Sequence, residues 1–137
     1  MKRVNSYQDV QVMTADGVRL IILLYEGVIR FNKKAAQAIE KGDIEERTKS
    51  INKSIAILAE LSGSLNMEEG GEIARNLFKL YDFSIERLTR ANGTNDPAQI
   101  EGVNRVINEL KAGWESIATQ GARSSATREA ASLRHGA

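Results

Sequence analysis

VRLIILLYEGVIRF, the stretch from Val18 to Phe31, decides the fold class of this chain. At about 100° per residue, its apolar side chains cover roughly 200° of a helical wheel. A helix of an ordinary small bundle carries a narrower apolar stripe, on the side that faces the core. The stretch therefore predicts a helix with more apolar surface than one core can cover.

Capping signals divide the chain into four predicted helices. The 137 residues include one Pro and many good helix formers, which favours helices throughout. Thr14 and Asp43 fit N-caps, and Gly42 fits a left-handed C-cap between two helices. Asp96 followed by Pro97 fits the N-cap and first residue of another helix. The predicted helices run from 14 to about 41, from 43 to between about 65 and 69, from about 72 to 91, and from 97 to about 118.

Glycines mark both ends of the third predicted helix. Gly70 and Gly71 predict the turn before it, and Gly93 fits its C-terminal cap. Because the connections are short, neighbouring helices should run antiparallel, which gives an all-α, up-down-up-down four-helix bundle. Residues 119–137 are small, polar and non-periodic, and a disordered tail is predicted there. The expected organisation is an N-terminal arm (1–13), a bundle domain (14–118) and a C-terminal tail (119–137).

Composition argues against several classes of function. The chain has no Cys and one His, His135, so we expect neither a catalytic imidazole nor a metal site. Basic residues are in excess in 1–13 and 119–137, and the part between them is mildly acidic, so nucleic acid is not the expected partner. No apolar run has the length of a signal peptide or a bilayer span. These features predict a soluble, cytosolic protein.

The short motifs indicate no catalytic chemistry. EEGGE (68–72) lacks the Lys and the Ser or Thr that a phosphate-binding loop needs. LYEG (24–27) and LYDF (80–83) pair a Tyr with an acid, but a tyrosine with an ordinary pKa near 10 is a poor base. We expect no enzyme activity, no cofactor and no metal. A cofactor-binding bundle is the hypothesis that a metal analysis of the purified protein would revive.

The surplus apolar surface of the first two predicted helices needs a cover. Each Leu or Ile left exposed forgoes about 1.5–3 kcal/mol of burial. The N-terminal arm, a partner protein or a second copy of the chain could supply the cover, and the residues alone leave all three open. The predicted partner-binding residues are Tyr7, Leu20, Leu23, Leu24, Ile51, Ile55 and Ile57.

Three long motifs resemble those of one protein family. They are MTADGVRLIILLYEGVIRF followed by KGD, then GGEIARNLFKLYDFSIERLTRAN, then NDPAQIEGVNRVINELKAGWESI. Their order and spacing, from about Tyr7 to Ala118, are similar to those of the flagellar secretion chaperone family FliS. The resemblance implies a cytosolic four-helix bundle without catalytic activity. It also implies binding of the disordered C-terminal segment of flagellin, protection against premature polymerisation, and delivery to the flagellar type III export apparatus.

The resemblance also implies a role for the N-terminal arm. In the family, a Tyr followed by Gln lies over part of the binding surface when the protein is free, and Tyr7 and Gln8 match that pair. Family members also touch an anti-sigma factor and components of the export apparatus, which makes these possible secondary partners. A hypothesis of a different class is a homodimeric helical scaffold that uses the apolar face of the first helix. We expect a monomer or a weak homodimer.

Overall fold

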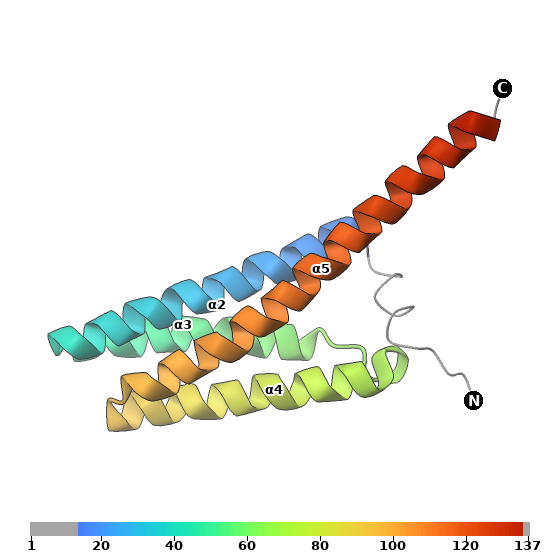
Figure 1. Cartoon of the computed structure of the whole chain (residues 1–137). Helices are drawn as coiled ribbons and strands as arrows, with labels where there is room; N and C mark the ends of the chain where they lie inside the picture. Colours follow the sequence, from blue (N-terminus) through green and yellow to red (C-terminus); the bar gives the residue numbers. More distant parts are fainter. Residues whose placement is uncertain (1–13, 136–137) are drawn as a thin grey trace.

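The computed structural model describes residues 14–135, with side chains up to residue 121, and this part of the chain forms four helices. They are α2 (Ala15–Lys41), α3 (Ile44–Gly63), α4 (Met67–Thr94) and α5 (Pro97–His135). Each helix packs against the next in the sequence, and α5 packs back on α2, which closes an antiparallel bundle (Figure 1). The predicted all-α four-helix architecture is confirmed.

Short polar side chains begin three of the helices where the sequence predicts them. Thr14 Oγ1 accepts a hydrogen bond of 3.0 Å from the backbone N–H three residues later. Asp43 Oδ1 accepts the equivalent bond at 3.1 Å, and Asp96 Oδ1 accepts one of 3.0 Å at the start of α5. Gly42 ends α2 with φ of 72°, a left-handed conformation that costs glycine little. The predicted caps of α2, α3 and α5 are therefore confirmed.

Both ends of α4 differ from the prediction. Asn66 caps the helix through a 3.0 Å bond from the Glu69 N–H, so one helical turn precedes the two glycines. Gly71 then interrupts the helix with φ 52° and ψ −128°, a conformation that a residue with a Cβ adopts only under strain. At the far end, Asn95 (φ 60°) takes the left-handed C-cap in place of Gly93. The helix is therefore longer at both ends, with a kink at the predicted turn.

Helix α5 is also longer than predicted. Its end was expected at about Ala118, but the backbone stays helical to His135. The last part projects beyond the other three helices (Figure 1). The predicted end is based on the end of the apolar stripe. The helical backbone continues beyond that point.

All four helices contribute to one core. Its largest fully buried side chains come from every helix and are Tyr25, Ile51, Leu58, Tyr81, Leu88, Ile100 and Ile107. Burying a large apolar side chain completely is worth about 1.5–3 kcal/mol, so these positions account for much of the cohesion of the bundle. None of the helices in the described part of the chain combines the length and the apolar composition that a membrane crossing requires.

Candidate functional site: two apolar surfaces

Only part of the predicted partner-binding set lies at the surface. On α2, Leu20 is 56% exposed and Leu23 is 54% exposed, whereas Leu24 is half-buried. On α3, Ile51 is 0% exposed and belongs to the core. The bundle therefore places Ile51 inside the core and not at the surface with Leu20 and Leu23. Tyr7 lies outside the described residues.

A contact over Gly27 determines how α3 lies against α2. A Cβ added to Gly27 would stand 3.0 Å from Cδ1 of Ile57, so the missing side chain lets Ile57 approach the α2 backbone. One turn later in α2 and one turn earlier in α3, Lys53 Nζ lies 5.4 Å from the centroid of the Phe31 ring. This antiparallel register places Leu20 beside the C-terminal end of α3. We call this region the α2–α3 surface; it comprises Leu20, Leu23, Leu24 and Ile57.

Ile55 does not belong to that surface. Residues two positions apart on a helix point roughly 160° away from each other, so Ile55 and Ile57 face different neighbours. Ile55 lies seven residues after Thr48, whose Oγ1 donates to Asn92 Oδ1 of α4 at 3.1 Å. Ile55 is therefore on the α4 side of α3, where it is half-buried. The bundle thus places the two isoleucines on different sides of α3, Ile55 toward α4 and Ile57 toward α2.

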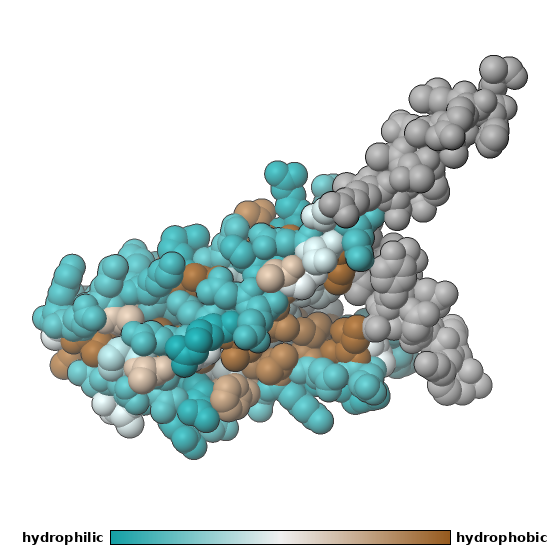
Figure 2. Space-filling view, viewed as in Figure 1, coloured by the Kyte–Doolittle hydropathy of each residue, from teal (hydrophilic) through white to brown (hydrophobic). Residues whose placement is uncertain are grey.

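A second apolar surface lies where α4 and α5 diverge (Figure 1). The two helices meet near their turn, where Arg87 Nη1 donates to Gln99 Oε1 at 2.8 Å. Steps of seven residues keep the same side of a helix, and they lead from Arg87 to Leu80 and from Gln99 to Val106. We call this region the α4–α5 surface; its half-buried side chains are Ile73, Leu77, Leu80, Val106, Leu110 and Ile117. Figure 2 shows hydrophobic side chains gathered between these two helices.

Sequence reasoning missed the α4–α5 surface because a helical wheel assigns its residues to the core. The apolar stripe of α5 is continuous on the wheel, and Ile100, Val103 and Ile107 are indeed buried. The neighbouring positions of the same stripe stay half-buried, since α4 moves away from α5 along its length. That divergence is a property of the packed bundle and leaves no local signal in the sequence.

Three aromatic side chains join α2, α4 and α5 behind the α4–α5 surface. The hydroxyl oxygens of Tyr25 and Tyr81 are 2.6 Å apart, and their rings meet edge to face at 69° with centroids 6.3 Å apart. Trp114 Nε1 donates to the Tyr25 hydroxyl at 3.0 Å. Both tyrosines are buried and Trp114 is half-buried. The cluster therefore extends from the core, at the two tyrosines, towards the α4–α5 surface, at Trp114.

The tyrosine hydroxyls hold the helices together and do not serve as proton carriers near neutral pH. Burial raises the pKa of Tyr25 above its ordinary value, against the opposing effect of its hydrogen bonds to Tyr81 and Trp114. Burial also raises the pKa of Tyr81, and the nearby Tyr25 raises it further. Both groups therefore stay protonated well above neutral pH, where neither can act as a general base.

A hydrogen-bonded pair of asparagines, Asn32 buried and Asn104 half-buried, aligns α2 with α5. Asn32 is 0% exposed, and its Nδ2 donates to Asn104 Oδ1 at 2.8 Å. The amide nitrogen of Asn104 in turn donates to the backbone oxygen of Ile29 at 3.3 Å. Moving either helix by one residue would break both bonds and leave the buried amide nitrogen of Asn32 unpaired. The register of α2 against α5 is thus set by polar groups inside the bundle.

Taken together, these features describe a helical bundle with apolar side chains at the surface on two sides. Half-buried Leu, Ile and Val side chains along a helix pair are the usual receptors for the apolar face of an amphipathic helix. An apolar surface of this kind fits a partner protein better than it fits a small polar substrate.

Comparisons with known proteins agree on one family. The family model described as "Flagellar protein FliS" matches residues 1–121. The chain is 39% identical over 121 residues to the flagellar secretion chaperone FliSB of Pseudomonas aeruginosa, covering 85% of this chain and 96% of that one. It is 34% identical over 109 residues to the flagellar secretion chaperone FliS of Vibrio cholerae, covering 80% of each chain. It is 36% identical over 113 residues to the FliS chaperone of Campylobacter jejuni, covering 82% and 88%. The chain therefore belongs to the FliS family, a family of flagellar secretion chaperones rather than of enzymes.

Proposed function

We propose that this protein is a cytosolic export chaperone for flagellin, without catalytic activity. It binds the C-terminal segment of flagellin, which is disordered in the free monomer, and keeps it from polymerising before export. It then delivers the loaded client to the flagellar type III export apparatus. Membership of the FliS family supports this proposal, and the observation that carries it in the fold is the row of half-buried apolar side chains between α4 and α5.

The two apolar surfaces suit a client that folds as it binds. Ordering a disordered segment costs about 2–5 kcal/mol, so the interface has to exceed the ordinary size of about 1,600 Å². Neither surface alone offers that area, since each consists of a few side chains on one helix pair. The α2–α3 and α4–α5 surfaces belong to different helix pairs, so one segment reaches both only by running around the bundle. Short amphipathic helices in that segment would then lie against the α2–α3 and α4–α5 surfaces.

Calorimetric titration with the last ~50 residues of the flagellin from the same organism tests the proposal, since that length can supply the required area. We expect submicromolar, one-to-one binding with a large negative heat-capacity change, because apolar surface is buried. An absence of binding would contradict the proposed function. A dimer that persists in sedimentation experiments with client present would favour the homodimeric scaffold instead.

Single charged substitutions test the two surfaces separately. Leu23→Asp and Leu80→Asp each place a carboxylate where the client would bury an apolar side chain, and each should weaken binding at least about tenfold while the bundle stays folded. Ile44→Asp is the matched control, because Ile44 is 64% exposed but begins α3 at the end of the bundle away from Leu23. If Leu23→Asp and Leu80→Asp bind as tightly as Ile44→Asp, neither surface belongs to the client site.

The N-terminal arm is the remaining part of the proposal. We expect that Tyr7 and its neighbours cover part of the client surface in the free protein. Deleting residues 1–12 should then raise the affinity for the flagellin segment, or expose enough apolar surface to cause aggregation. A truncated protein that stays in solution and binds more weakly would mean that the arm contacts the client directly. An anti-sigma factor and a component of the export apparatus are the secondary partners we propose.

A further inference from the structure

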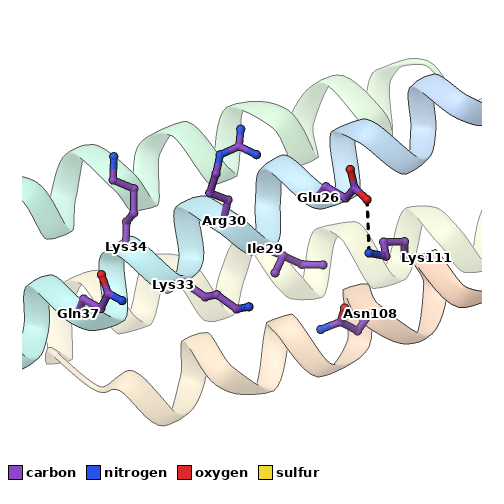
Figure 3. A pocket seen from close by; sticks show the side chains of 8 residues that line it. All are labelled: Glu26, Ile29, Arg30, Lys33, Lys34, Gln37, Asn108 and Lys111. Atoms are coloured by element: carbon purple, nitrogen blue, oxygen red, sulfur yellow. Dashed lines mark hydrogen bonds and ion pairs between the residues drawn. The ribbon is translucent and has the colours of Figure 1, made fainter.

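A basic depression lies between α2 and α5, on a different helix pair from either apolar surface (Figure 3). Its lining includes one carboxylate, Glu26, and four cationic side chains, of which Lys33 and Lys111 lie between the two helices. The four cations are Arg30, Lys33, Lys34 and Lys111. The bundle between the two terminal segments is mildly acidic by sequence, so this concentration of positive charge is a local feature.

Internal ion pairs neutralise this charge only in part. Lys111 Nζ lies 3.5 Å from Glu26, and Lys34 Nζ lies 3.9 Å from Glu46, with all four side chains partly exposed. Among the side chains of residues 14–121, no carboxylate lies within ion-pair distance of Arg30 or Lys33. Solvent-exposed pairs of this kind contribute little, and they exchange readily for an incoming carboxylate.

The remaining lining adds groups that a peptide can use. Ile29, with 8% of its surface exposed, supplies an apolar contact, and the side-chain amides of Gln37 and Asn108 can hydrogen-bond a peptide backbone. Figure 3 shows Lys33 and Asn108 extending into the space between the helices from opposite sides. We propose that this depression is a docking site for an acidic segment of a partner protein.

The charges of the chain indicate that the occupant comes from another molecule. Residues 1–13 carry two basic residues and one acid, and residues 119–137 carry three basic residues and one acid. Both terminal segments therefore carry net positive charge, which repels them from a basic depression. A nucleic acid would require cations that follow a line of phosphates, whereas Lys33 and Lys111 meet across one hollow, with Arg30 and Lys34 at its edge on the α3 side of α2 (Figure 3). A short acidic peptide matches both the sign of the charge and the size of the site.

Anisotropy titration with a short fluorescein-labelled peptide of alternating Glu and Ser tests the proposal. We expect saturable binding at low ionic strength, and its loss at about 1 M NaCl, where the Debye length falls to about 3 Å. The Lys33→Glu/Lys111→Glu variant should weaken binding at least about tenfold, because it replaces two attractive contacts by two repulsive ones. Lys33 is exposed and Lys111 is partly exposed, and circular dichroism checks that the bundle still folds.

The matched control is Arg75→Glu/Lys79→Glu, which changes the net charge equally on the exposed side of α4. It should keep the wild-type affinity for the acidic peptide. Equal weakening in both double variants would overturn the proposal, since it would reduce the effect to net charge. So would a wild-type protein that fails to bind the peptide, or one that binds single-stranded DNA at least as tightly. The flagellin segment should bind the Lys33→Glu/Lys111→Glu variant normally, because both residues lie on the α2–α5 side and outside the two apolar surfaces, which separates this site from the proposed client site.

Discussion

Removing the two buried tyrosine hydroxyls one at a time measures how the aromatic cluster holds α2, α4 and α5 together. The Tyr25 oxygen lies 2.6 Å from the Tyr81 oxygen and accepts a 3.0 Å bond from Trp114. Tyr25→Phe therefore breaks two hydrogen bonds, whereas Tyr81→Phe breaks one. A buried polar group that loses its partner costs about 1–3 kcal/mol. We expect Tyr81→Phe to lower the free energy of unfolding by about 1–2 kcal/mol, and Tyr25→Phe by about 2–4 kcal/mol.

The double variant provides the sharper comparison. In Tyr25→Phe/Tyr81→Phe no buried hydroxyl is left without a partner, because both members of the pair are gone. Its cost should therefore be smaller than the sum of the two single costs by about 1 kcal/mol or more. In this variant the Trp114 N–H loses its acceptor, but Trp114 is half-buried and its N–H can donate to water. The lost bond therefore adds little to the cost of the double variant.

Urea unfolding followed by circular dichroism at pH 7 gives all three free energies. Trp114→Phe removes the outer bond together with part of an indole ring that packs on the core, so its cost sets an upper limit on the contribution of that bond. A Tyr81→Phe variant that loses as much stability as Tyr25→Phe would refute the central position assigned to Tyr25. Strict additivity in the double variant would refute the coupling of the two hydroxyls.

Three further predictions concern pH, a helix end and a close contact. Because burial raises the pKa of Tyr25 and Tyr81 in the folded state, their contribution is complete below about pH 10 and is lost as the pH rises from there towards the folded pKa; urea midpoints should fall more steeply above that pH for wild type than for the double phenylalanine variant. Gly42→Ala should cost about 1–2 kcal/mol in thermal unfolding, because φ is 72° there, and Gly42→Asn should cost less. Gly27→Val should cost about 1–3 kcal/mol, because its Cβ would stand 3.0 Å from Ile57 Cδ1, and adding Ile57→Ala should recover part of that loss in urea unfolding.

The fold could be predicted from the sequence because its signals are local. An N-cap such as Thr14 or Asp43 acts within one helical turn, and so does the left-handed C-cap at Gly42. The prediction failed where two residues competed for one role. Gly93 and Asn95 both tolerate a left-handed conformation, and the longer helix that ends at Asn95 is the one that forms.

The candidate site was less predictable because it depends on which helices are neighbours. The sequence places three isoleucines close together in α3, but the bundle sends them to different neighbours. Ile51 lies in the core, Ile55 lies beside α4 and Ile57 lies beside α2. The periodicity of α3 cannot separate these destinations before its partners are known. The opening between α4 and α5 is likewise invisible in either helix alone.

The asparagine pair between α2 and α5 has a consequence for a protein that keeps apolar groups outside as well as inside. A helix with two apolar faces can pack either of them against the core. A rotation or a shift in register would then bury the face that otherwise lies at the surface. Asn32 Nδ2 and Asn104 Oδ1 pair in a single alignment, and any other leaves the buried amide nitrogen of Asn32 without its partner, at a cost of about 1–3 kcal/mol. The asparagine pair thus favours one register of α2 against α5. Registers that would bury the apolar side chains of the two surfaces inside the bundle are disfavoured.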